Sequence, residues 1–300
     1  MVRILATDGI ESSAAKALTD LGFEVVQQFY EENELPARAA EFDVVVVRSA
    51  TKIRKPVIDA AAGRLKLIIR GGVGIDNIDA VYAKEKGIEV QNTPMASSAS
   101  VAELAIAHMF SLARFIYDAN VTMRAGKWDK KRYEGIELGG KTLGLIGMGR
   151  IGRAVAKMAS GLGMKVVYND ITGHLPVNDP YAFVSLDNLL AKADFISMHV
   201  PKTDKPIISA ENIAKMKKGV YIINTARAAL IDMKEMLKAL ESGKIAAAAL
   251  DVFDEEPIKD AVIYTHPKIS MTPHIGASTV EAQLRIGENI VSIISEKFKP

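Results

Sequence analysis

Short apolar runs alternate with amphipathic helical segments along the N-terminal third of the chain. Helical patterns occupy residues 12–21 and 78–86. This rhythm predicts parallel strands covered by helices on both faces of a sheet. The strand-like runs are VRILAT (2–7), FEVVQQ (23–28), DVVVVRS (43–49), KLIIRG (66–71) and IEVQN (88–92).

A second series of the same kind begins at Leu143, so we predict an α/β protein with two doubly wound parallel-sheet domains. Two Thr-Pro segments, NTPM (92–95) and MTPH (271–274), each end a strand-like run and suit rigid crossings between domains. We therefore expect a domain of residues 94–274 inserted into a domain of residues 1–93 and 275–300, with a cleft between them. The strand-like runs of the second series are LGLIG (143–147), MKVVYND (164–170), ADFISMHV (193–200), GVYIINTA (219–226) and IAAAALDVF (245–253).

One long segment, from Ser100 to about Asp118, is apolar nearly all round. Ser100 and Glu103 have the spacing of a capping box at the start of this predicted helix. A helix without a polar face needs burial on more than one side. It is either an internal core helix or one that also packs against a second subunit.

Composition narrows the class of protein. The 300 residues are 49% hydrophobic and carry a formal net charge of +2, which gives no electrostatic reason to expect nucleic acid or a membrane as partner. The chain has no cysteine, and its five histidines lack metal-ligand spacing, so we expect no metal site. No apolar run has the length of a signal peptide core or a membrane span, and a cytoplasmic location is the expectation.

The sequence GMGRIG places Gly147, Gly149 and Gly152 in the spacing G-x-G-x-x-G, between a strand-like run and a helical pattern. Glycines there let backbone N–H groups approach a pyrophosphate at the helix N-terminus. Asp170 ends the next strand-like run, where its carboxylate would accept hydrogen bonds from the adenosine ribose and repel a 2′-phosphate. The pattern predicts a dinucleotide site that prefers NAD to NADP.

Three later segments supply polar side chains at strand ends: NTARAALID with Arg227, ALDVFDEEP with Glu256, and TPHIGAST with His274. Hydride transfer at a hydroxyl carbon needs these three types of group. An arginine can bind a carboxylate with two hydrogen bonds, a histidine can exchange the hydroxyl proton, and a carboxylate can orient that histidine and favour its imidazolium form.

Together with VRSATKIR (47–54) and GGVGIDNID (71–79), these motifs resemble the D-isomer-specific 2-hydroxyacid dehydrogenases over nearly the whole chain. The resemblance implies a Rossmann-type NAD domain inserted into a flavodoxin-like substrate domain, a homodimer formed through the NAD domains, and Arg227, Glu256 and His274 as catalytic residues. The cofactor contacts that it implies are Gly147, Gly149, Arg150, Ile151, Gly152, Asp170, Val200, Thr225, Ala226, Asp251, Gly276 and Ala277.

The sequence departs from the family pattern in three places. Ala228 and Ala229 replace two glycines that usually follow the motif arginine, which fits only if neither position needs a positive φ. The segment HVPKTDKPII (199–208) is shorter than the usual loop, which affects the contacts expected around Val200. No regulatory domain follows Pro300, so serine feedback, common in longer relatives, would need a site elsewhere.

Within the family, the resemblance is closest to members that oxidise D-3-phosphoglycerate in serine biosynthesis. Substrate contacts are expected from basic and polar side chains in VRSATKIR and from backbone donors in GGVGID, while the basic run GKWDKKRYEG (126–135) is a weaker candidate for a phosphate contact. Glyoxylate, hydroxypyruvate or D-lactate remain alternative substrates, and a peptide-binding, NAD-sensing corepressor is a non-enzymatic alternative. The candidate substrate residues are Arg48, Ser49, Lys52, Arg54, Gly72, Val73 and Gly74.

Overall fold

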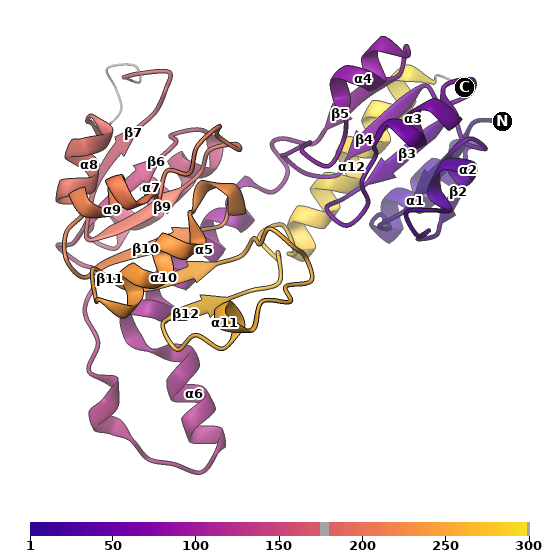
Figure 1. Ribbon diagram of the computed structural model, residues 1–300. Coiled ribbons are helices and arrows are strands. Elements are labelled where there is room, and N and C mark those ends of the chain that lie inside the picture. The colour runs from indigo at the N-terminus through magenta and orange to yellow at the C-terminus, as the bar shows by residue number, and fades with distance from the viewer. Residues whose placement is uncertain (175–179, 299–300) are drawn as a thin grey trace. The chain divides into compact units, whose positions relative to one another are not determined.

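The computed structural model describes residues 1–174 and 180–298, which form two α/β units (Figure 1). Unit 1 contains residues 1–98 and the C-terminal segment from residue 277, and unit 2 contains residues 99–276. The chain thus leaves unit 1 to build unit 2 and then returns. Both divisions lie close to the two Thr-Pro segments.

Unit 1 is built on five parallel strands in the order β2-β1-β3-β4-β5, which is the flavodoxin-like order. Its strands are β1 (Arg3–Ala6), β2 (Glu24–Gln27), β3 (Val44–Val47), β4 (Leu67–Arg70) and β5 (Glu89–Asn92). Its helices are α1 (Ser12–Asp20), α2 (Leu35–Ala39), α3 (Lys55–Ala61), α4 (Ala80–Glu85) and α12 (Val280–Lys297).

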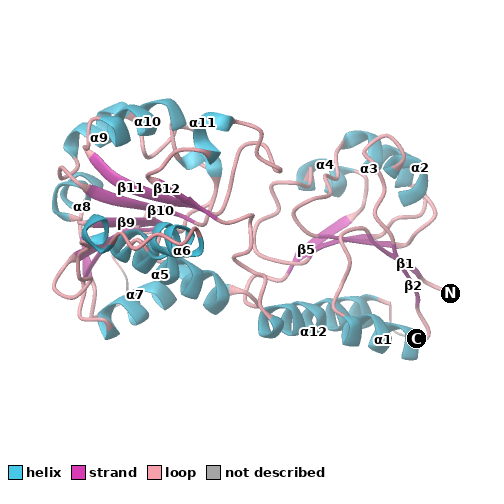
Figure 2. Ribbon diagram, turned by 90° about the horizontal axis from the view of Figure 1, so that it is seen from below, coloured by secondary structure: helices cyan, strands magenta, loops and turns pink. Residues whose placement is uncertain are grey.

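The central strand β3 shows why this unit needs helices on both faces. Its four valines are all buried, and successive side chains point to opposite faces. Val45 and Val47 pack in one cluster with α2 and α3, whereas Val44 and Val46 pack in another with α1 and α12. Figure 2 shows α1 and α12 together on one side of this sheet and α2, α3 and α4 on the other.

Unit 2 is built on seven parallel strands in the order β12-β11-β10-β9-β6-β7-β8. The chain starts at β6, adds two strands on one side, and crosses back to β9, so the order reverses between β6 and β9. Ligands of doubly wound sheets bind at the carboxyl ends of the strands beside this reversal. The strands are β6 (Thr142–Ile146), β7 (Lys165–Asn169), β8 (Ala182–Phe183), β9 (Phe195–Met198), β10 (Val220–Asn224), β11 (Ile245–Leu250) and β12 (Ile269–Met271).

Helices cover both faces of the second sheet, as Figure 2 shows, with α5 and α7 on one face and α9 and α10 on the other. The prediction of two doubly wound α/β domains is therefore confirmed. The helices of unit 2 are α5 (Ser98–Arg114, which begins at its border), α6 (Ile116–Arg124), α7 (Arg150–Gly161), α8 (Leu186–Lys192), α9 (Ala210–Lys215), α10 (Met233–Glu241) and α11 (Ala261–Tyr264), with short 3₁₀ turns η1 (Lys130–Tyr133) and η2 (Ala228–Leu230).

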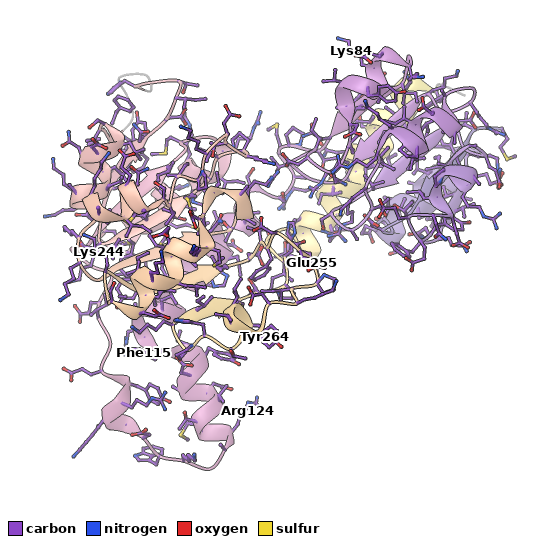
Figure 3. All side chains as sticks on the ribbon, viewed as in Figure 1. Lys84, Phe115, Arg124, Lys244, Glu255 and Tyr264 are labelled. Atoms are coloured by element: carbon purple, nitrogen blue, oxygen red, sulfur yellow. The ribbon has the colours of Figure 1, made fainter. Side chains whose placement is uncertain are left out.

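The expected continuous helix from Ser100 to Asp118 is wrong in two respects. Phe115 has a left-handed backbone (φ 53°), which separates α5 from α6, and Figure 3 labels Phe115 and Arg124 at the two ends of α6. The capping box is also wrong, because α5 begins at Ser98 and the Ser100 hydroxyl donates instead to the backbone oxygen of Gly276 (2.7 Å).

No single helix in the described ranges is long and apolar enough to cross a membrane. Helices α5 and α6 reach that length and composition only as a pair, and the pair is bent by 64° at its break.

Candidate active site

The predicted catalytic residues all follow neighbouring strands of unit 2. Arg227 follows β10, Glu256 follows β11, and His274 follows β12, and these three strands pair in parallel. Parallel strands end at the same edge of a sheet, so the three loops leave from one edge.

Glu256 and His274 are in direct contact. Nδ1 of His274 lies 2.8 Å from Oε2 of Glu256, and the other carboxylate oxygen accepts a hydrogen bond from Phe253 N (3.1 Å). Partial burial acts to raise the pKa of Glu256, but the His274 hydrogen bond and charge, followed by Phe253 N and the Arg227 charge, outweigh it and hold that pKa below its ordinary value. With Nδ1 engaged by the carboxylate, Nε2 of His274 is the ring nitrogen left for a substrate.

The loop that carries Arg227 is shaped by Asn224, a fully buried side chain that we did not single out from the sequence. Its Oδ1 accepts from Ala226 N (3.0 Å), and its Nδ2 donates to Arg227 O (2.8 Å). An asparagine between a strand and a turn is a known signal for such local bonding and could have indicated it. Neither Ala228 nor Ala229 has a positive φ, which explains why alanines can replace glycines here.

Each of the three glycines after β6 is suited to its position for a different structural reason. Gly147 has φ +92°, and a Cβ there would lie 2.6 Å from the backbone oxygen of His199. A Cβ on Gly152 would lie 2.2 Å from Gly147 O, so this glycine allows α7 to pack closely on the loop. A Cβ on Gly149 would meet no atom within 4 Å, which leaves open space beside the N-terminus of α7. A pyrophosphate requires such space next to unpaired helix N–H groups.

Asp170 lies beside this loop at the end of β7. Its Oδ2 accepts from Met148 N (2.7 Å), and its Oδ1 accepts from the backbone N (2.9 Å) and hydroxyl (2.8 Å) of Thr172. Burial acts to raise the pKa of Asp170, but the hydrogen bonds from Met148 and Thr172, with the charge of Arg153, hold it below its ordinary value. Asp170 is therefore ionised at neutral pH, as the predicted contact with a ribose would require. Arg153 was not expected from the sequence to contribute.

Two buried polar atoms near the reversal of strand order suit a polar ligand. The Thr225 hydroxyl after β10 and Nδ1 of His199 after β9 have no hydrogen-bond partner in the described part of the chain. Burial lowers the pKa of His199 to about 4, so its ring is neutral at pH 7. Buried groups of this kind are normally satisfied, and a bound dinucleotide would supply partners here. Of the predicted cofactor residues, Val200 also lies in this region, against Gly147.

The predicted substrate residues lie in unit 1, at the carboxyl ends of β3 and β4. The Asp8 carboxylate holds the loop after β3 by accepting from Arg48 N (2.6 Å), Thr51 N (3.2 Å) and the Thr51 hydroxyl (2.5 Å). Arg54 pairs with Asp79 (2.9 Å), so its charge is already partly balanced. Lys52 and Ser49 are exposed, and Gly72 has φ +144° with the guanidinium of Arg70 lying directly against it. Asp8 and Arg70 were not expected from the sequence.

Comparison with known proteins decides the family. Residues 106–276 match the family model described as "D-isomer specific 2-hydroxyacid dehydrogenase, NAD binding domain". The chain belongs to this family. The match confirms the prediction of an oxidoreductase that acts on CH–OH groups and has an NAD-binding domain.

Three relatives of this 2-hydroxyacid dehydrogenase indicate the range of activities near it. A hydroxypyruvate reductase of Thermotoga maritima is 47% identical over 99% of this chain and 98% of its own length. A D-3-phosphoglycerate dehydrogenase of Methanocaldococcus jannaschii is also 47% identical over 100% of this chain, which spans only 57% of that longer protein. The crystal structure of a glyoxylate reductase from Paecilomyes thermophila is 33% identical, with a TM-score of 0.88 over 99% of this chain and 96% of that one.

Proposed function

We propose that this dehydrogenase is a cytoplasmic homodimer that oxidises D-3-phosphoglycerate to 3-phosphohydroxypyruvate with NAD, a reaction of serine biosynthesis. The observation that carries the proposal is the hydrogen-bonded Glu256–His274 pair, with the charge of Arg227 acting on the same carboxylate. The choice of 3-phosphoglycerate as the substrate rests on the basic side chains that follow β3.

The roles of the three residues follow from their chemistry. The Arg227 guanidinium binds the substrate carboxylate, and Nε2 of His274 accepts the proton of the 2-hydroxyl group as the C2–H bond is broken. Glu256 stabilises the resulting imidazolium through Nδ1. NAD, when bound, supplies the hydride acceptor, and in the opposite direction His274 returns the proton to the carbonyl oxygen.

The proposed phosphate contacts rest mainly on Arg48 and Lys52. The structure shows no ion pair for either side chain within residues 1–174 and 180–298, whereas Arg54 would have to give up part of its contact with Asp79. D-Lactate carries a methyl group where 3-phosphoglycerate carries a phosphate, so it would leave these cations without a partner.

Hydroxypyruvate reduction is the second candidate. It is favoured by the Thermotoga relative, which this chain matches over nearly the whole of both proteins. Hydroxypyruvate has no phosphate and needs no contact with Arg48, so the two candidates make different predictions for an Arg48 variant.

We expect 3-phosphoglycerate to be used at least about 10-fold more efficiently than D-glycerate or D-lactate. Arg48→Met should lower kcat/KM for 3-phosphoglycerate by about 10- to 150-fold, mainly through KM, because a charge-assisted contact is held in both ground and transition states. The same variant should change D-glycerate oxidation little. NADH absorbance measures all three reactions.

Arg38→Met is a matched control, because Arg38 lies in α2 and pairs with Glu41 on the surface. It should leave every rate near that of the native enzyme. Equal use of D-glycerate and 3-phosphoglycerate, or an equal loss on all substrates in Arg48→Met, would contradict the phosphate site and favour hydroxypyruvate.

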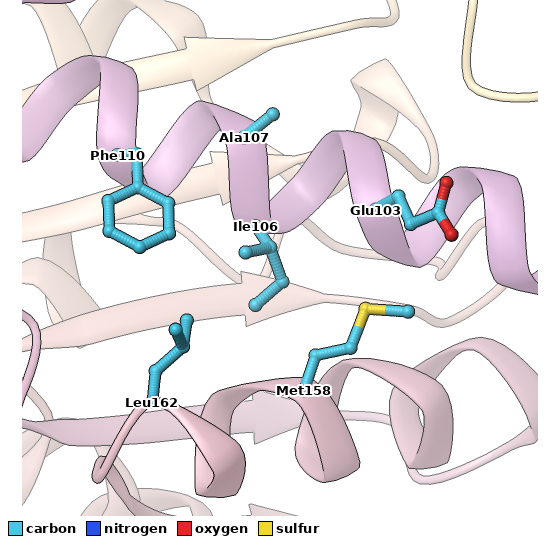
Figure 4. A pocket seen from close by; sticks show the side chains of 6 residues that line it. All are labelled: Glu103, Ile106, Ala107, Phe110, Met158 and Leu162. Carbon is cyan, nitrogen blue, oxygen red and sulfur yellow. The ribbon is translucent and has the colours of Figure 1, made fainter.

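The homodimer is proposed from an apolar face on unit 2. A hollow of about 450 Å³ lies between α5 and α7 and is lined by Glu103, Ile106, Ala107, Phe110, Met158 and Leu162 (Figure 4). Phe110 also lines a second hollow against α6. Helix α6 has no buried residue and exposes Ile116, Tyr117, Val121 and Met123. An apolar face of this extent is typical of an interface, and the homodimer implied by the family resemblance makes a second copy its proposed occupant.

Phe110→Glu should convert the dimer to a monomer in sedimentation experiments, because it would bury an unpaired charge in the proposed interface. Lys84→Glu, at an exposed position of α4 in unit 1, is the control and should leave the mass unchanged. A native protein that sediments as a monomer would contradict the proposal.

A further inference from the structure

The backbone of His274 adopts a conformation that non-glycine residues rarely occupy. Its φ is 53°, in the left-handed region. His274 follows β12 in a tight turn, in which its backbone N donates a hydrogen bond to Thr272 O (3.0 Å). Such a backbone persists only where surrounding contacts hold it, and strained residues of this kind occur at functional sites.

The contacts that hold this turn converge on Asp251, whose side chain is almost fully buried. Its Oδ1 accepts from Ile275 N (2.8 Å) and from the Thr272 hydroxyl (2.6 Å), and its Oδ2 accepts from Gly276 N (2.9 Å). One carboxylate thus binds the chain on both sides of His274. These internal bonds engage both oxygens, and the cofactor contact of Asp251 implied by the family resemblance stays a prediction.

The direction of these hydrogen bonds determines which ring nitrogen of a second histidine, His108, carries the proton. A hydroxyl has one hydrogen, and Thr272 donates it to Asp251. Its oxygen can then only accept from Nε2 of His108, which lies 3.0 Å away. His108 is buried, and burial lowers its pKa although the charge of Asp251 partly opposes this. The chain of bonds therefore runs from a neutral His108, protonated at Nε2, through Thr272 to Asp251.

Helix α5 holds the same turn at a second point. The Ser100 hydroxyl donates to Gly276 O (2.7 Å), about two helical turns before His108. A Cβ on Gly276 would lie 3.1 Å from Asp251 Oδ2 and 3.3 Å from Val101, so the turn packs closely against the start of α5. All of these residues belong to unit 2.

We propose that His108 is a positioning residue for catalysis: acting through the Thr272 hydroxyl and the Asp251 carboxylate, it holds the left-handed His274 backbone and so keeps the His274 ring against Glu256. This inference rests on the proposed role of His274. His108 itself touches neither His274 nor Glu256 in the described hydrogen-bond network, so its effect is on placement.

The first test removes the hydrogen bond that His108 donates to Thr272. His108→Leu should lower kcat for reduction of hydroxypyruvate by about 10-fold, because small displacements of a catalytic group are costly, while KM and the NADH dissociation constant stay within about 2-fold. His108→Gln keeps a donor amide and should recover most of that loss. Thr272→Val and Thr272→Ser form a second pair with the same expectation. Thermal unfolding is measured for all four variants.

Equal kcat values for His108→Leu and His108→Gln would overturn the proposal, as would a loss that appears only in NADH affinity or in thermal stability. The outcome is separable from that of the proposed function. If the native enzyme reduces no 2-keto acid, or if His274→Ala keeps full turnover, the proposed function fails.

The second test needs no activity. Nitrogen-15 spectra of the histidine rings in the cofactor-free protein should include the signal of a neutral ring protonated at Nε2 that is lost in His108→Gln. With only five histidines in the chain, the signal can be assigned by substitution. A His108 ring protonated at Nδ1 would reverse the bond to Thr272 and overturn the proposal.

Discussion

His274→Ala should lower kcat by about 10²- to 10⁴-fold, the range that follows removal of a general acid–base. In the proposed function the His274 ring, hydrogen-bonded to Glu256 through Nδ1, exchanges the substrate proton at Nε2, and alanine removes that group. NADH binding should be nearly unchanged. Stopped-flow turnover and NADH fluorescence titration measure the two effects separately.

Glu256→Gln should shift the pH profile of the reduction reaction in a defined direction. Reduction requires the protonated histidine, so its rate falls as pH rises and the imidazolium loses its proton. The amide removes the negative charge that stabilises the imidazolium, and the falling limb of the pH profile should move to lower pH. An unmoved limb, or a large loss of NADH binding in His274→Ala, would contradict the assigned pair.

Asp170→Ala should change the ratio of NAD to NADP efficiency by about 10²- to 10³-fold in favour of NADP. A hydrogen bond from the ribose 2′-hydroxyl, which NADP lacks, to a charged acceptor is worth roughly 1.5–3 kcal/mol, and the repulsion of a 2′-phosphate also disappears with the carboxylate. The low pKa of Asp170 keeps this charge present at neutral pH. Initial rates with both cofactors measure the ratio.

Asp170 also accepts hydrogen bonds from Met148 N and Thr172 N, so its replacement also removes contacts that hold the backbone around it. Thr172→Val is the matched control, because it removes only the hydroxyl that donates to Asp170. It should keep the NAD preference. A native enzyme that prefers NADP, or an Asp170→Ala variant with an unchanged ratio of NAD to NADP efficiency, would show that this carboxylate does not bind the adenosine ribose.

The sequence by itself determined the elements that depend on local pattern. The run of four valines in β3 predicted a strand buried on both faces, and the spacing of Gly147, Gly149 and Gly152 predicted the turn into α7. Periodicity and glycine spacing act over a few residues, which is why a single sequence reveals them. The types and order of Arg227, Glu256 and His274 were visible for the same reason.

Only the tertiary structure decided which distant groups meet. It paired Arg54 with Asp79, which reduces the part that Arg54 can have in binding a phosphate, and it broke the apolar segment at Phe115. It also joined His108 to Asp251 through Thr272, across more than 140 positions of sequence. No local pattern marks such partners, because a buried polar group is satisfied by whatever the packing of strands and helices brings within hydrogen-bond distance.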